Sequence, residues 1–194
     1  MNRLAPIALL AVVVVSGCGS KQETTAASAP VPAAAAGQQT APNVTEAVAG
    51  AEVGSMMPAY SAKYLDGAKL DLAAEHGHVV FLNLWATWCG PCRYEIPELQ
   101  ALHDKYAPKG FKVIGVSLDE SGVAAVKEFA AAQKMTYPIA IDPEGRLSTV
   151  LQTSVVPTSV LIDRSGRIVW KRFGVVSTSD ETLTSALQQA LARG

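Results

Sequence analysis

The hydrophobic and polar positions of the chain divide it into three parts. A short apolar run directly follows a basic start, a long stretch of Ala, Thr, Gln, Ser and Pro comes next, and hydrophobic periodicity returns only after it. A stretch with so few branched apolar or aromatic residues cannot bury enough surface to offset the entropy of ordering. We therefore expect a leader over residues 1–17, a flexible tether over 18–51 and one folded domain over 52–194.

Strand and helix patterns alternate within the folded part. An Asp-Gly pair at 66–67 separates two alternating runs and predicts a hairpin. The continuous apolar run 79–85, bounded by turn residues, predicts a strand that is buried on both faces. Predicted strands cover 59–65, 68–70, 79–85, 111–118, 137–141, 158–163 and 167–173, and predicted helices cover 90–106, about 121–134 and the C-terminal end of the chain.

Several residues mark where these helices begin or bend. Ser121 is expected to cap the second helix, and Thr178 matches a capping box with Glu181 before the last one. Pro97 lies inside the first helix, where it removes a backbone hydrogen bond and should bend the axis. The inner face of the second helix is expected to carry Val123, Val126 and Phe129. The strand, helix and strand over 79–118 then form a parallel pair.

Charge and the N-terminal run narrow the choice of partner and compartment. The 194 residues carry a formal net charge of −1, so nothing favours nucleic acid as a partner. The apolar run over 4–15 is too short to span a bilayer, but with its basic start it is typical of an export signal. Val15-Ser16-Gly17-Cys18 resembles the lipobox of bacterial lipoproteins, which predicts lipidation of Cys18. The alternatives are an ordinary signal cleaved near Ser16-Gly17 and an uncleaved anchor.

The three cysteines are consistent with that assignment. If Cys18 carries lipid, then Cys89 and Cys92 are the only thiols of the mature protein and form a closed pair. They lie two residues apart at a strand-to-helix junction. Unpaired N–H groups and a partial positive charge at a helix start favour a thiolate on the first cysteine. The spacing therefore predicts a redox dithiol, and a single pair without further ligands is a poor zinc site.

The segment from Asn83 to Pro97, NLWATWCGPCRYEIP, resembles the TlpA/ResA-like branch of the thioredoxin superfamily. Those proteins are exported or membrane-anchored thiol:disulfide oxidoreductases, and the resemblance covers about residues 53–192. It implies an α/β, thioredoxin-like fold. The expected architecture is a mixed central sheet flanked by helices, with an N-terminal β-hairpin and an inserted helix near 121–134.

The resemblance also suggests roles for the residues around the dithiol. Cys89 is the expected nucleophile, and Cys92, one helical turn on, is expected to release the partner. Glu95 is implied as a carboxylate that assists the thiols as a general base; the alternative is a solvated carboxylate near the helix start. Minimal thioredoxins have a buried aspartate where this chain has Asn83, and an asparagine cannot take a proton, which strengthens the role of Glu95.

Two further segments are expected at the site. Val155-Val156-Pro157-Thr158 matches the family's cis-proline loop, in which the Val156 backbone would pair with an extended partner chain. The alternative is an ordinary trans proline that opens a strand. Trp88 is expected to cover the disulfide and contact partners, whereas Trp85 is expected in the core. The three histidines, His76, His78 and His103, are scattered and predict surface or loop roles rather than a metal site.

These features together predict an exported, lipid-anchored, monomeric disulfide reductase without a cofactor. The Gly-Pro pair between the cysteines is typical of reducing thioredoxins. Since the chain has no nicotinamide or flavin motif, a membrane donor would supply its electrons, and the resemblance implies oxidised exported proteins such as apocytochrome c as substrates. A thiol peroxidase is the first alternative, but Ala86 occupies the position where peroxiredoxins have a threonine. The second is a metallochaperone of related fold, which would have three residues between its cysteines.

Overall fold

A computed structural model describes residues 50–193 of the chain. The predicted signal peptide and nearly all of the predicted tether, with Cys18, lie outside this range. Over residues 50–193, no helix combines the length and apolar character needed to cross a bilayer. The elements are β1 (Ser61–Tyr64), β2 (Lys69–Asp71), β3 (Val79–Trp85), α1 (Gly90–Tyr106), β4 (Phe111–Ser117), α2 (Val123–Ala132), β5 (Ile139–Ile141), α3 (Arg146–Leu151), β6 (Thr158–Ile162), β7 (Ile168–Phe173) and α4 (Glu181–Ala192), with 3-10 turns at Leu72–Glu75 and Ala107–Lys109.

The seven strands form one mixed sheet in the order β2-β1-β5-β4-β3-β6-β7. β4 pairs in parallel with β3 and β5, and the remaining pairs are antiparallel. Leu84 near the end of β3 pairs with Thr158 at the start of β6. The segment that follows β3 and the segment that precedes β6 therefore meet at the same end of the strands. Cys89 belongs to the first of these segments and Pro157 to the second.

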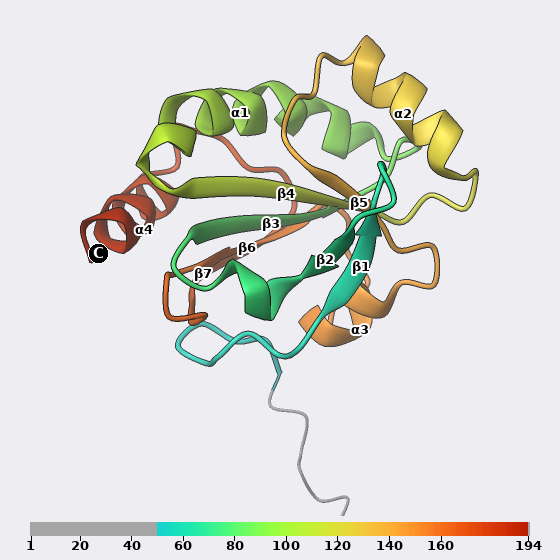
Figure 1. Cartoon of the computed structure of the whole chain (residues 1–194). Coiled ribbons are helices and arrows are strands. Elements are labelled where there is room, and N and C mark those ends of the chain that lie inside the picture. The colour runs from blue at the N-terminus through green and yellow to red at the C-terminus, as the bar shows by residue number, and fades with distance from the viewer. Residues whose placement is uncertain (1–49, 194) are drawn as a thin grey trace, which may run out of the picture. The chain divides into compact units, whose positions relative to one another are not determined.

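Two hydrophobic clusters cover the two faces of the sheet. Helices α1, α2 and α4 pack on one face, whereas α3 and the segment that includes Ala51 pack on the other (Figure 1). Every residue of β3 is buried, as the continuous apolar run predicts. Alternate side chains point to opposite faces of a strand, so β3 contributes to both clusters. Those in the first cluster are Val79, Phe81 and Trp85, and those in the second are Val80, Leu82 and Leu84.

The short helix α3 is absent from the sequence prediction, which has only a turn at 142–145. Asp142 is fully buried, and its carboxylate accepts a hydrogen bond from the Leu147 amide at 2.7 Å, which satisfies a free N–H at the helix start. Leu147 and Leu151 are buried against the sheet. A helix of six residues is too short to display a convincing hydrophobic period, so only packing reveals it.

Two predicted helix starts are wrong in detail. α2 begins after Gly122 instead of Ser121, and Val123 is 41% exposed instead of facing the core. α4 is capped by Asp180, which accepts hydrogen bonds from the amides of the first turn. The Thr178 hydroxyl, the predicted cap, instead donates to the Glu98 carboxylate of α1. A distant acceptor can capture a capping side chain, and local spacing does not reveal that competition.

Candidate active site

Cys89 and Cys92 form a disulfide at the amino end of α1. Cys89 is the N-cap residue, and its Sγ accepts a hydrogen bond from the Cys92 amide at 3.2 Å. That N–H group and the positive end of the helix would stabilise a thiolate on Cys89 once the disulfide is reduced. Cys89 is 5% exposed and Cys92 1% exposed. Both features favour Cys89 as the sulfur that meets a partner.

The segment before Cys89 is held by a buried carboxylate that the sequence does not single out. Asp119 accepts hydrogen bonds from the Thr87 amide at 2.9 Å and the Ser117 hydroxyl at 2.6 Å, and its other oxygen accepts from the Thr87 hydroxyl. The guanidinium of Arg93 donates two hydrogen bonds to the Thr87 carbonyl, at 3.0 and 2.8 Å. The one available signal was position, because Asp119 follows β4, whose end lies beside that of β3.

Glu95 is buried at the centre of a hydrogen-bond network. Its side chain is 1% exposed, so the alternative of a solvated carboxylate is wrong. One oxygen accepts from the Asn83 amide at 2.8 Å, and the other accepts from the Val176 backbone N–H at 2.9 Å. Asn83 also donates to the Ser159 hydroxyl at 3.0 Å. Asn83 on β3 therefore positions the carboxylate of the helix.

Burial also changes the acidity of this carboxyl group. It raises the pKa of Glu95 from 4.5 to about 7, against the opposing effect of the two hydrogen bonds from Val176 and Asn83. Burial, together with the nearby charge of Glu95, raises the pKa of Tyr137. Residues three apart on a helix share a face, so Glu95 lies next to Cys92 along α1. A carboxyl group with a pKa near neutrality is well matched to exchange protons with a thiol.

The loop before β6 forms the neighbouring wall of the site. The Val156–Pro157 peptide bond is cis. The Thr158 hydroxyl donates to the Val155 carbonyl at 2.6 Å, and the Gly174 amide donates to the Pro157 carbonyl at 2.8 Å, so the loop is tied on both sides. Val156 is half-buried between the two hydrophobic clusters. The pairing of its backbone with a partner chain remains a prediction.

The two tryptophans have different environments. Trp85 is 1% exposed and packs on Phe129 with ring centroids 5.6 Å apart, which confirms its predicted core position. Trp88, next to Cys89, is 65% exposed. Tyr94 of α1, at 79%, and Val155 of the cis-proline loop, at 45%, are also exposed, and the sequence prediction gives neither side chain a role of its own. Trp88 and Val155 belong to the two segments that meet at this end of the sheet, so their exposed apolar side chains are available to a polypeptide partner.

A disulfide at the amino end of a helix, beside a cis X-Pro loop at the same end of the strands of a mixed sheet, is the arrangement of the thioredoxin-like thiol:disulfide oxidoreductases. Comparison with known proteins places the chain more narrowly. Residues 39–189 match the Redoxin family, to which the chain belongs, and its relatives make it a TlpA/ResA-like protein of the thioredoxin superfamily. The predicted fold class and the predicted enzyme class are thereby confirmed.

Named relatives support both conclusions. The thiol-disulfide oxidoreductase ResA of Bacillus cereus is 36% identical over 138 residues, which are 71% of this chain and 78% of that protein. A crystal structure of a Chlorobium tepidum protein described as thiol:disulfide interchange protein DsbE superposes with a TM-score of 0.66 at 32% identity, covering 72% of this chain and 98% of that one. A secreted thiol-disulfide isomerase of Corynebacterium glutamicum gives 0.64 at 25% identity, covering 71% and 86%.

Proposed function

We propose that the protein is an exported, membrane-tethered reductase of disulfides in other exported proteins. The observation that carries this proposal is the buried Glu95 carboxyl group, held one helical turn after Cys92 with a pKa near neutrality. Such a group is suited to take up the proton that Cys92 must lose before it can release a partner. The Cys89–Cys92 pair and the thiol-disulfide oxidoreductase relatives support the same chemistry.

The exchange has two steps. The Cys89 thiolate attacks a partner disulfide, so that one partner sulfur leaves as a thiolate and a mixed disulfide forms. Cys92 then gives its proton to Glu95, directly or through a water molecule, and its sulfur attacks Cys89. The second partner sulfur leaves, the partner has gained two electrons, and the protein carries the Cys89–Cys92 disulfide. A thiol donor associated with the membrane would return the protein to its dithiol state.

Among oxidised exported proteins, the proposed substrate is apocytochrome c. This choice of substrate is based on the family resemblance. The exposed side chains of Trp88, Tyr94 and Val155 are suited to contact an unfolded or extended polypeptide, whose apolar side chains are accessible. The protein would act as a monomer, because each chain carries both cysteines and the proposed base.

Redox equilibration tests the direction of exchange. Incubation with glutathione buffers should give a reduction potential near that of reducing thioredoxins, about −270 mV, and far below the −120 mV of strong oxidants. The reduced protein should also reduce a model disulfide such as insulin, and Cys89→Ser should not. A potential near −120 mV would instead identify an oxidant of exported thiols.

Lipid attachment at Cys18 is a separate proposal with its own test. Its support is the Val15-Ser16-Gly17-Cys18 segment directly after the apolar run. In cells fed a labelled fatty acid, the wild-type chain should carry label and sediment with membranes. Cys18→Ala should lose the label and keep its insulin-reducing activity, because the dithiol is unchanged. Equal labelling of both chains would refute the assignment.

A further inference from the structure

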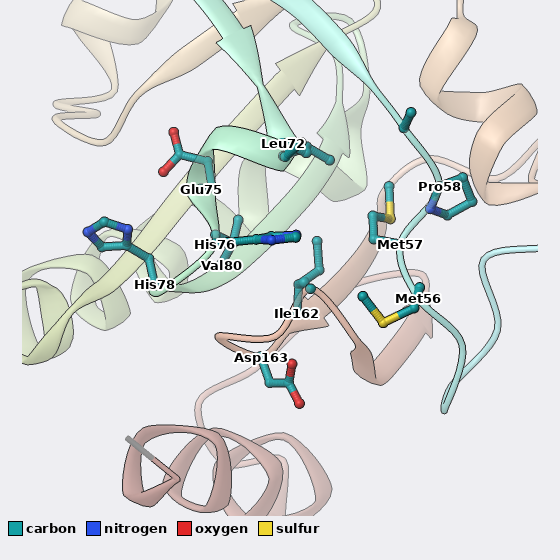
Figure 2. A pocket seen from close by; sticks show the side chains of 13 residues that line it. Met56, Met57, Pro58, Leu72, Glu75, His76, His78, Val80, Ile162 and Asp163 are labelled. Carbon is teal, nitrogen blue, oxygen red and sulfur yellow. The ribbon is translucent and has the colours of Figure 1, made fainter.

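A small cavity lies at the end of the strands opposite to the dithiol. It has a volume of about 190 Å³ and lies between the segment before β1, the 3-10 turn Leu72–Glu75 and the β6–β7 hairpin (Figure 2). Val80 at the start of β3 and Ile162 at the end of β6 form part of its wall. Cys89 follows the other end of β3, so this cavity is separate from the candidate active site.

Two thioethers and two imidazoles, all soft or borderline metal donors, line the cavity. The side chains of Met56, Met57 and His76 lie around one space in Figure 2, whereas the His78 ring points away from it. Gly166 makes room for Met56 and His76. A Cβ atom on Gly166 would lie 2.5 Å from His76 Nε2 and 3.2 Å from the terminal methyl group of Met56. The imidazole nitrogen and the end of the Met56 side chain therefore both lie close to the same point.

The two carboxylates of the cavity are already engaged. Asp163 Oδ1 accepts hydrogen bonds from the amides of Ser165 and Arg167. Glu75 forms an ion pair with Lys112 at 2.6 Å. The His76 ring has no hydrogen-bond partner within residues 50–193, and it is exposed. His78 Nδ1 is also buried without a hydrogen-bond partner within residues 50–193, but its ring points away from the methionines (Figure 2). The donors that are free and face one another are thus the two thioether sulfur atoms and the His76 imidazole.

We propose that Met56, Met57 and His76 form a binding site for a single Cu(I) ion. Thioether ligands select Cu(I) among biological metals, and imidazole also suits copper. Zinc, calcium and magnesium need thiolate, imidazole or oxygen ligands in larger sets. Within residues 50–193, His, Cys, Asp and Glu side chains nowhere gather in threes suited to a metal. Met56 and Met57 are adjacent in the chain. Because methionine side chains are flexible, both sulfur atoms can move to coordinate one ion.

Access to the site is consistent with this proposal. Met56 is 47% exposed, and its exposure leaves the thioether open to solvent and to an arriving ion. Met57 is half-buried and packs against the second hydrophobic cluster, which anchors one ligand. The sequence prediction gave His76 a loop role, and it had no means of placing the two methionines beside a residue some twenty positions later. The Met57 amide donates a hydrogen bond to the Gly166 carbonyl at 2.8 Å, and Gly166 lies beside the His76 ring. This hydrogen bond therefore holds the two methionines near His76.

Anaerobic titration of the full chain with Cu(I), in competition with bicinchoninate, tests the site. The Cys89–Cys92 disulfide is kept intact, so the dithiol cannot bind the metal. Wild type should take up one equivalent more than the triple variant Met56→Leu/Met57→Leu/His76→Gln. Each single substitution should weaken this binding about tenfold or more, because each removes one of three ligands. Cys18 is present in every variant, so any copper bound there appears equally in all of them.

Matched substitutions elsewhere serve as controls. Met135→Leu, in the first hydrophobic cluster, and His103→Gln, on α1, should retain wild-type affinity. In NMR spectra, Cu(I) should shift the Met56 and Met57 methyl signals and the His76 ring signals, and Zn(II) should not. Unchanged affinity in the triple variant, with its fold verified by circular dichroism, would overturn the proposal. So would Zn(II) binding with the same dependence on the methionines.

Discussion

Replacing Cys92 with alanine should stop the exchange while Cys89 is still joined to its partner. Cys89 retains its position at the helix N-cap, and the Cys92 backbone N–H that it faces is unaffected by the substitution. The first step therefore proceeds, whereas the attack that releases the partner has lost its sulfur. A thiol from solution is a poor substitute, because well-oriented intramolecular attack has a very large effective concentration. We expect turnover to fall by at least about a thousandfold.

The trapped adduct also identifies the partner. Cys92→Ala expressed in cells should give disulfide-linked complexes that are resolved by non-reducing gels and identified by mass spectrometry. Cys89→Ala is the matched control and should give none. The double variant Cys18→Ala/Cys92→Ala should still trap, which shows that the adduct is not formed by Cys18. Normal turnover in Cys92→Ala would contradict the two-step exchange, and an absence of complexes in cells would count against a reductase of exported proteins.

Glu95→Gln should remove a proton acceptor without removing its volume. The glutamine oxygen can still accept from the Val176 N–H, and the Asn83 amide can turn to accept from the new NH2 group. In the wild-type protein the rate of partner release should rise through about pH 7, where Glu95 becomes ionised. In Glu95→Gln this rise should be lost and the rate above pH 7 should fall by about a hundredfold.

Glu98→Gln is the matched control for this prediction. Glu98 lies one turn further along α1 and also accepts from the loop before α4, through the Thr178 amide at 2.8 Å. Hydrogen bonds from the Thr178 side chain and backbone lower the pKa of Glu98, so it is ionised at all working pH values. Its substitution should leave the inflection near pH 7 in place. If Glu95→Gln keeps that inflection, the proton acceptor is a different group.

The same carboxyl group makes stability depend on pH. The folded pKa of Glu95 lies above the unfolded value of 4.5, so the folded state holds the extra proton between pH 4.5 and about 7. The free energy of unfolding should therefore decrease as the pH rises across this window, by on the order of 3 kcal/mol in total. In Glu95→Gln that contribution to the slope should disappear. Denaturant unfolding of the two proteins at pH 4.5 and pH 8 measures the difference.

The sequence by itself determined the elements around the dithiol. The continuous apolar run over 79–85 became the buried strand β3, and the spacing of three and four in the next segment became α1, with the predicted bounds 90–106. Asp66-Gly67 marked the β1–β2 hairpin. These predictions succeed because strand and helix periodicity are set by local backbone geometry, and a strand covered on both faces must be apolar throughout.

Tertiary structure alone decided the environments of the polar side chains. Glu95 meets Asn83 from 12 positions earlier and Val176 from 81 positions later, and together these contacts convert a carboxylate near a helix start into a buried group with a pKa near neutrality. Asp119 beside Thr87, and Met56 and Met57 around His76, are likewise products of chain packing. Burial and hydrogen bonding depend on which distant segment covers a side chain, and local sequence carries no record of that choice.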